Sequence, residues 1–158
     1  ICATHLPVQE HVDELLSIQI KGEVTKRFDR MLPTDLGNRV GVHVRYSDKR
    51  PEQDFQKLIQ KVKNEKVLLA TDSKEVQQTF LNECLDCVVL STILHDGNSK
   101  KGLHHQEFDH AKKLHVFEES LLDLYALSRA GTFLGQFNSS FSRIVGIWRE
   151  GQGVQFWS

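Results

Sequence analysis

Short apolar runs alternate with segments of helical periodicity along most of this chain. The runs of strand character lie at about 39–45, 67–70, 88–90, 132–135 and 154–157. The segments with apolar residues at helical spacing lie at about 8–31, 55–63, 74–83, 117–129 and 139–148. Strands that are mostly apolar are typical of a parallel sheet with helices on both faces. The sequence therefore predicts an α/β fold, a Rossmann-like three-layer domain with a mostly parallel sheet.

The size and charge of the chain limit the number of domains and the kinds of partner that we expect. Its 158 residues suffice for one domain, and we expect a helical linker segment at 1–38, packed on a Rossmann-like domain at 39–158. The charges nearly cancel, with 20 Lys and Arg against 21 Asp and Glu, so we expect no nucleic acid partner. No apolar run is long enough to span a membrane, so we expect no membrane segment in this chain.

The start of the sequence bears on its origin. It begins with Ile1 rather than Met, and we expect a processed chain or a fragment. The first residues lack the basic and then apolar pattern of a signal peptide. We expect a cytoplasmic location if the protein is bacterial, and the lumen of the secretory pathway if it is eukaryotic.

The first predicted strand ends in charged residues. In the sequence VGVHVRYSDK at 40–49, His43 and Arg45 alternate with valines, so both lie on one face of the strand. A cation at the carboxyl end of a buried strand is costly unless an anion pairs with it, and ligands bind at this edge of open α/β sheets. These residues therefore indicate an anion-binding site, with a structural ion pair of Arg45 as the alternative.

Two further predicted strands are followed by polar side chains. They are Thr71, Asp72 and Ser73 after the second strand, and Asn138, Ser139 and Ser140 after the fourth. The carboxyl ends of parallel strands lie along one edge of a sheet, so we expect both groups near Arg45. In the alternative interpretation, each group only caps the helix that follows it.

The chain lacks the glycine-rich sequences that usually bind nucleotide phosphates. No dinucleotide fingerprint follows the first strand, and no P-loop sequence occurs in the chain. Any phosphate would therefore be held by an arginine and by helix N-termini. Arg45, together with the hydroxyls and backbone amides of 139–142, would form a diphosphate site without a metal ion.

Asp123 occupies a narrow polar slot on the predicted helix at 117–129, which Gly131 would end. Leucines and a tyrosine cover most of this helix, and Glu119 shares the slot one turn away. The slot is either a stripe exposed to solvent or a place where a carboxylate faces a ligand. In the second case a purine with an amino group, such as guanine, offers paired N–H donors that a carboxylate accepts.

Cysteines and histidines offer alternative sites. Cys84 and Cys87 form a Cys-x-x-Cys pair, as in redox and zinc sites, but we expect ordinary buried thiols because the pair does not begin a helix. A polar stretch contains the metal-ligating side chains His95, His104, His105, Asp109, His110 and His115. The last histidines are spaced by five residues, which does not stack them on a helix, so we expect a polar loop over the pocket and no metal.

Four stretches of the chain resemble, in order, motifs of the GDP-fucose-dependent fucosyltransferases. This group includes the α1,6-fucosyltransferases, the nodulation-type enzymes and the protein O-fucosyltransferases. The stretches are GVHVRYSDK at 41–49, LATDS at 69–73, GLH at 102–104, and 119–143 with its Leu122-Asp123, Leu127-Ser128, Ala130 and Ser139-Ser140-Phe141. The resemblance implies the donor-binding, C-terminal Rossmann half of a GT-B-type glycosyltransferase.

The resemblance also implies roles for single residues. Arg45 would bind the β-phosphate of GDP and stabilise the leaving group. His43 and Asp123 would hold the guanine, and Ser140, with Phe141 beside it, would meet the diphosphate through its hydroxyl and backbone amides. The nucleotide-binding set predicted from the residues and the resemblance together is His43, Arg45, Asp123, Ser139, Ser140 and Phe141.

The remaining implied roles concern the sugar and the reaction. Asp72 and Lys49 would line the fucose side, and Glu52 would assist deprotonation of the acceptor. GDP-fucose would be the donor substrate, with no cofactor required, and fucose would pass to the acceptor with inversion and without a metal. The guanidinium of Arg45 would neutralise phosphate charge where other enzymes use Mg²⁺.

The chain departs from the family pattern in ways that leave alternatives open. Tyr46 stands where many α1,6 enzymes have a second arginine, and one extra residue lies between Ala130 and Ser139. The half that binds a glycan or protein acceptor would precede the first motif, so we expect it to be missing and this chain to have little activity alone. The alternatives are a non-catalytic Rossmann module that binds a nucleotide sugar or a protein, and a hydrolase that uses Asp72.

Overall fold

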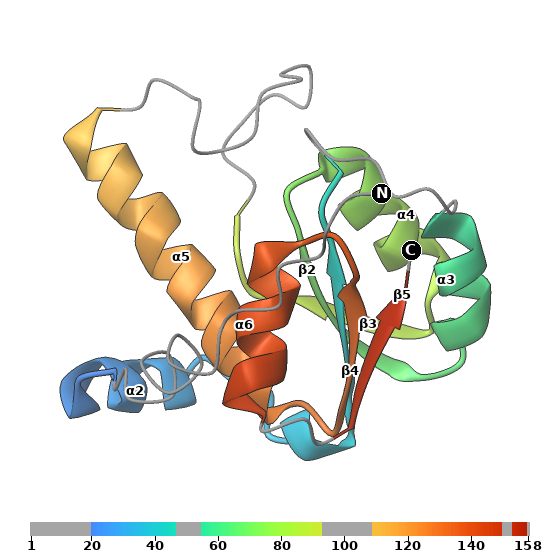
Figure 1. Cartoon of the computed structure of the whole chain (residues 1–158), viewed down its shortest axis with the longest axis horizontal. Helices are drawn as coiled ribbons and strands as arrows, with labels where there is room; N and C mark the ends of the chain where they lie inside the picture. The colour runs from blue at the N-terminus through green and yellow to red at the C-terminus, as the bar shows by residue number, and fades with distance from the viewer. Residues whose placement is uncertain (1–19, 47–54, 93–108, 150–152, 158) are drawn as a thin grey trace.

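The computed structural model of the chain describes residues 20–46, 55–92, 109–149 and 153–157. Within these residues, five strands form one sheet, and every neighbouring pair is parallel (Figure 1). The strands are β1 Val40–Val44, β2 Lys66–Thr71, β3 Asp86–Val89, β4 Thr132–Gln136 and β5 Val154–Trp157. Their order is β3-β2-β1-β4-β5, which puts β1 at the centre of the sheet.

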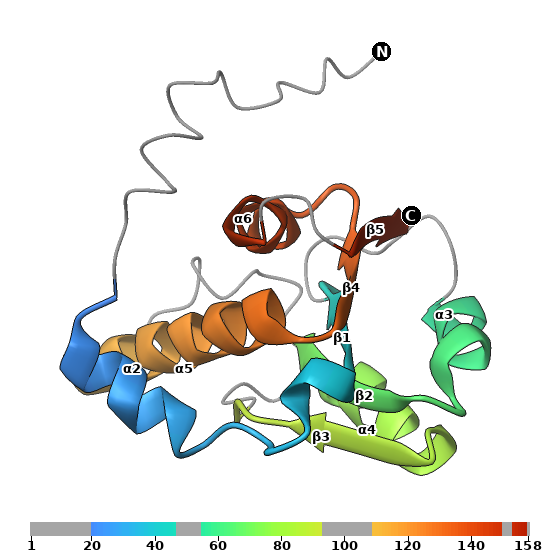
Figure 2. The same cartoon turned by 90° about the horizontal axis from the view of Figure 1, so that it is seen from below.

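Helices cover both faces of this sheet (Figure 2). They are α2 Gly22–Asp29, α3 Phe55–Val62, α4 Lys74–Glu83, α5 His110–Arg129 and α6 Ser140–Trp148, with a short 3-10 helix, η1, at Leu36–Asn38. One core lies between the sheet and α3 and α4, and includes Ile59 and Phe80. A second core lies between the sheet and α5 and α6, and includes Leu127 and Val145. The predicted three-layer Rossmann-like fold is therefore confirmed.

The side chains of β1 alternate between the two cores. Val42 and Val44 are fully buried in the core beneath α3 and α4. Gly41 faces α5 so closely that a Cβ there would lie 3.0 Å from Cδ2 of Leu127. His43, two residues further along, points to the same face as Gly41 and contacts α6. The strand thus brings His43 to the α5–α6 side of the sheet, near its carboxyl edge.

A network of ion pairs closes the opposite edge of the sheet. Arg39, which precedes β1, donates from Nε to Asp35 Oδ1 at 2.7 Å and from Nη1 to Asp86 Oδ1 at 2.9 Å. Lys66 Nζ also donates to Asp35, at 2.8 Å. These hydrogen bonds, with that from Lys66 the largest, lower the pKa of Asp35 to about 2. Arg39 therefore forms a structural ion pair at the amino end of β1, well away from Arg45 at the other end.

Helix α2 packs on α5 at the lower left of Figure 1. The rings of Phe28 and Tyr125 lie with their centroids 5.7 Å apart, and the Tyr125 hydroxyl donates a hydrogen bond to Asp29 at 2.8 Å. These contacts join the described part of the N-terminal segment to the rest of the fold. The division into a linker at 1–38 and a domain at 39–158 stays a prediction.

Helix α5 begins earlier than the sequence predicts. It starts at His110 rather than at Phe117, and the Asp109 carboxylate caps its first turn by accepting the backbone N–H of Lys112 at 2.8 Å. The expectation of a polar loop is therefore wrong for 110–115. The first turns of the helix project beyond the sheet, where Leu114 and Phe117 are exposed.

The carboxyl end of α5 is closed by an arginine. The guanidinium of Arg149, which is buried, donates to the backbone oxygens of Leu127, Ser128, Ala130 and Gly131. The helix gives way directly to an extended Ala130, so the prediction that Gly131 ends it as a glycine cap is wrong. Gly131 serves a different purpose, because a Cβ there would lie 2.2 Å from the carbonyl oxygen of Gly37.

Candidate functional site

Hydrogen bonds between the strand ends gather the predicted polar residues at the carboxyl edge of the sheet. The backbone N–H of Arg45, just past β1, donates to Oε1 of Gln136 at the end of β4, at 2.7 Å. The next backbone N–H, that of Tyr46, donates to Oδ1 of Asp72 after β2, also at 2.7 Å. The end of the central strand is thus tied to both neighbours, as the convergence of parallel strands predicts.

His43 lies buried beneath the first turn of α6. Its Nδ1 is 2.7 Å from Oγ of Ser142, and its ring stacks on Phe141 with centroids 4.6 Å apart and planes inclined by 26°. Burial, with the neighbouring charge of Arg45, lowers the pKa of His43 to about 3. The imidazole is therefore neutral at physiological pH. The structure brings together His43, Arg45 and Phe141, as the sequence predicts.

The amino end of α6 lacks a side-chain cap. Ser139 stands in the N-cap position, but its hydroxyl is buried and makes no hydrogen bond with any described residue. Ser140 begins the helix and is exposed. By contrast, Ser73 caps α4 by accepting the backbone N–H of Val76 at 3.4 Å. The simple cap interpretation thus holds for α4, whereas α6 leaves its first amides available to an anion.

The Ser142 hydroxyl does not face the predicted phosphate site. The sequence predicts that the hydroxyls of 139–142 face a diphosphate together. Ser142 instead is fully buried, accepts the backbone N–H of Gln136 at 2.9 Å, and contacts His43. Its oxygen is thus engaged by groups of the protein. The groups that remain to face a phosphate are Ser139, Ser140 and the backbone amides around them.

Asp123 lies on α5 and is buried, with 8% of its surface exposed. Burial raises the pKa of Asp123 to about 7; a hydrogen bond with Ser91 opposes this rise and the nearby Glu119 adds to it. Glu119 itself accepts the backbone N–H of Thr92 at 2.9 Å. The interpretation of this slot as a solvent stripe is therefore wrong. Asp123 is a carboxylate held at low polarity, where further N–H donors would favour its charged form.

Sequence reasoning missed Gln136, which is fully buried at the end of β4. Its side chain accepts the Arg45 backbone N–H and donates from Nε2 to Oδ1 of Asn138 at 2.9 Å. Gln136 thereby fixes both the chain that carries Arg45 and the loop that leads into α6. The one available signal is a polar residue directly after the apolar run at 132–135, one position beyond the predicted strand.

Lys49, predicted for the fucose side, and Glu52, predicted to assist deprotonation of the acceptor, lie outside the described residues, as does Asp48. Asp72 lies at the correct edge, and its carboxylate is engaged by the Tyr46 backbone. The roles of Asp72, Lys49 and Glu52 toward fucose and acceptor stay predictions.

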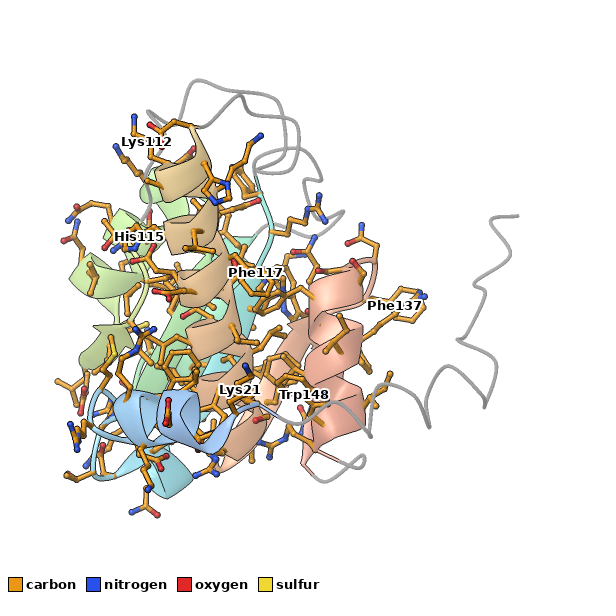
Figure 3. The ribbon with its side chains drawn as sticks, turned by 90° about the vertical axis from the view of Figure 1, so that its left-hand side faces the viewer. Lys21, Lys112, His115, Phe117, Phe137 and Trp148 are labelled. Carbon is orange, nitrogen blue, oxygen red and sulfur yellow. The ribbon has the colours of Figure 1, made fainter. Side chains whose placement is uncertain are left out.

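The structure gives little support to the alternative metal site. Asp109 caps α5, and His115, which projects from the outer part of this helix (Figure 3), pairs with Glu119 at 3.5 Å. Within the described ranges, no three His, Cys, Asp or Glu side chains gather closely enough to hold a metal ion. The remaining histidines of the set, His95, His104 and His105, fall outside those ranges.

The cysteine pair matches the expectation of ordinary thiols. Cys84 is buried, Cys87 is half-buried in β3, and both are free. Burial, reinforced by Cys84, raises the pKa of Cys87 to about 12. A thiol with so high a pKa is a poor nucleophile, because the thiolate is the reactive form.

A cavity of about 260 Å³ lies between α2 and α5, and its lining includes Leu90, directly after β3. Phe28 and Leu122 are among its apolar lining residues. The charged groups on its rim pair with each other, since Arg27 lies 3.2 Å from Glu118. This cavity contains none of the residues predicted for the anion-binding edge.

Solved structures that are similar in fold to this chain include fucosyltransferases. The chain is similar to the fucosyltransferase NodZ from Bradyrhizobium, with a TM-score of 0.52 and 18% identity over 80% of this chain. It is also similar to the NodZ α-1,6-fucosyltransferase co-crystallised with GDP (TM-score 0.51, 20% identity, 80% of this chain) and soaked with GDP-fucose (0.51, 19%, 82%). No family model and no curated protein matches the chain.

This chain has the fold of part of these enzymes. It covers 42%, 41% and 43% of the three NodZ chains, or about two fifths of their length. That share is consistent with one half of a GT-B-type glycosyltransferase, the fold class predicted from the sequence. In the described part of the chain, no helix is both long and apolar enough to cross a membrane.

Proposed function

We propose that this chain is the donor-binding half of a GDP-fucose-dependent fucosyltransferase. Together with an acceptor-binding half, it would transfer fucose to a glycan or protein acceptor. The proposal is supported by the position of His43 and Arg45 beside the uncapped amino end of α6. It is supported further by the fold, since NodZ was crystallised with GDP and soaked with GDP-fucose.

The observation that carries the proposal is the buried hydroxyl of Ser139. It lacks a partner among the described residues, although a buried hydroxyl without a hydrogen bond is costly. A phosphate oxygen at the amino end of α6 would accept from this hydroxyl and from the backbone amides of the first turn. The guanidinium of Arg45, at the end of the adjoining strand, would bind the β-phosphate.

The nucleobase would lie toward α5. The buried carboxylate of Asp123 would accept the paired N–H groups on the amino side of guanine, while His43 would contact the same base. Adenine lacks this pair of donors, so the site would prefer GDP to ADP. Phe141, stacked on His43, would keep the imidazole in place.

In the proposed reaction, an acceptor hydroxyl attacks the anomeric carbon of fucose from the side opposite GDP. The bond from that carbon to the β-phosphate oxygen breaks, and the configuration inverts. Arg45 stabilises the negative charge that develops on the departing phosphate, without a metal ion. Asp72 and Lys49 would line the fucose side, and Glu52 would accept the proton of the acceptor hydroxyl.

Calorimetric titration of the whole chain with GDP, with ADP as the control ligand, tests the donor site. Binding of GDP but not of ADP is expected. Replacing Arg45 with alanine should weaken GDP binding by about 30-fold, corresponding to the loss of a charge-assisted contact worth about 2 kcal/mol. Arg30→Ala removes the same charge from the exposed end of α2 and should leave GDP binding unchanged.

The outcomes separate the candidate functions. Equal binding of GDP by wild type and Arg45→Ala would refute the central assignment. If GDP binds but no fucose is transferred when an acceptor-binding half is supplied, the chain is a non-catalytic nucleotide-sugar module instead.

A further inference from the structure

Three buried groups form a continuous hydrogen-bonded chain behind the base side of the site. The backbone N–H of Gln136 donates to Oγ of Ser142 at 2.9 Å, and that oxygen lies 2.7 Å from Nδ1 of His43. Ser142 is fully buried, and His43 is 7% exposed. Water therefore has little access to the contact between the hydroxyl and the imidazole.

The protons of this chain can be assigned by counting donors and acceptors. Ser142 Oγ already accepts the Gln136 amide, and its single proton has one acceptor among its contacts, Nδ1 of His43. If Nδ1 carried a proton instead, the serine proton would be buried without an acceptor, which is costly. The hydroxyl therefore donates to Nδ1.

The rest of the imidazole follows from this assignment. Burial and Arg45 keep the ring neutral at physiological pH, so it carries a single proton. With Nδ1 acting as an acceptor, that proton resides on Nε2. The stacking on Phe141, with centroids 4.6 Å apart, holds the plane of the ring.

We propose that Ser142 is a positioning residue that holds His43 in the Nε2–H tautomer, so that the imidazole presents an N–H donor to the nucleobase. The proposal rests on the proposed function, because it assigns the base to the His43 side. Guanine has acceptors at O6 and N7, whereas adenine carries an amino donor in place of O6. Ser142 would thus favour guanine without touching it.

The tautomer can be read in the free protein, before any ligand is added. Heteronuclear NMR of the labelled 158-residue chain at neutral pH should show a protonated Nε2 and an unprotonated Nδ1 for His43. In Ser142→Ala this preference should be lost, and both nitrogens should average between the two forms. Ser142→Thr, which retains a hydroxyl, should restore it. A protonated Nδ1 in the wild-type protein would overturn the proposal.

Ligand binding then separates a positioning role from a merely structural one. Ser142→Ala should weaken GDP binding by about 10-fold. Inorganic pyrophosphate should lose much less, because only the Gln136 N–H, which also loses its acceptor, lies near the phosphate side. Both affinities should recover in Ser142→Thr. Equal losses for GDP and pyrophosphate would indicate a general distortion of the site and would overturn the proposal. If the wild-type chain binds no GDP, the proposed function fails, and the NMR result alone decides whether Ser142 sets the tautomer.

Discussion

The carboxylate of Asp72 accepts the backbone N–H of Tyr46 at 2.7 Å, across the ends of β2 and β1. This bond sets the direction in which the chain leaves the central strand, directly after Arg45. Asp72 therefore has a structural role in the site, whatever its role toward fucose. A variant of Asp72 must be read with both roles in view.

Asp72→Ala should lower the free energy of unfolding by about 1–2 kcal/mol, because the half-buried Tyr46 N–H loses its acceptor. Asp72→Asn keeps an amide oxygen in the same place and should lose less. Urea denaturation of the three proteins measures both values. If the asparagine variant is as unstable as the alanine variant, the hydrogen bond from Tyr46 is not what stabilises this edge.

The stability of the protein should depend on pH through Asp123. Burial raises its pKa to about 7, so the folded chain binds a proton more readily than the unfolded chain, where the pKa is about 3.9. The free energy of unfolding therefore falls as pH rises from about 4 to 7, and the loss is complete above 7. Asp123→Asn should remove this dependence and stabilise the chain by up to about 4 kcal/mol at alkaline pH.

Urea unfolding of wild type and Asp123→Asn at acid and alkaline pH measures this effect. The advantage of the variant should be large above pH 7 and small near pH 4. A difference of the same size at both pH values would mean that the Asp123 carboxylate does not titrate abnormally.

The same residue should separate base recognition from phosphate recognition. Asp123→Asn should weaken GDP by about 10-fold or more, because a carboxylate that accepts paired N–H groups is replaced by an amide. Inorganic pyrophosphate, which has no base, should bind the variant and the wild type equally. Calorimetry with both ligands checks this, and equal losses would move Asp123 away from the base.

Gly131→Ala should destabilise the fold, because the new Cβ would lie 2.2 Å from the carbonyl oxygen of Gly37. Neither atom belongs to a flexible side chain, so the backbone itself would have to shift. The expected loss in the free energy of unfolding is about 1–3 kcal/mol, as for other overpacked sites. Gly37→Ala is the matched control, since nothing lies within 4 Å of a Cβ there. Thermal denaturation compares the two, and similar midpoints would contradict the close approach.

The sequence predicts the strands well because a buried parallel strand needs a continuous apolar run, as in β2 and β4. It misplaces the start of α5 because the first turns of that helix touch no sheet. Leu114 and Phe117 are exposed there, so the first turns contribute little to the core, and the Asp109 cap is the local signal of where the helix begins.

The candidate site shows the same division between local and distant causes. The start of α6 at Ser140 follows from the adjacent serines and could be predicted from them, whereas the failure of the Ser139 hydroxyl to cap the helix could not. The contact of His43 with Ser142 joins residues 99 positions apart, and that of Arg45 with Gln136 joins residues 91 apart. Local sequence patterns cannot predict contacts between residues so far apart in the chain. For Asp123, the sequence allows either a stripe exposed to solvent or a carboxylate that faces a ligand. Only the burial of the side chain in the folded protein separates the two.

The central place of β1 has a consequence for how the protein is made. β1, β2 and β3 pair in succession as they leave the ribosome, but β1 must wait for β4, whose first residue is Thr132. Such long-range parallel pairing is slow to form. His43 contacts Ser142 on α6 and Arg45 contacts Gln136 on β4, so the proposed donor site cannot be complete until those segments emerge. The proposed donor site would therefore form late in synthesis, when β4 and α6 join the sheet.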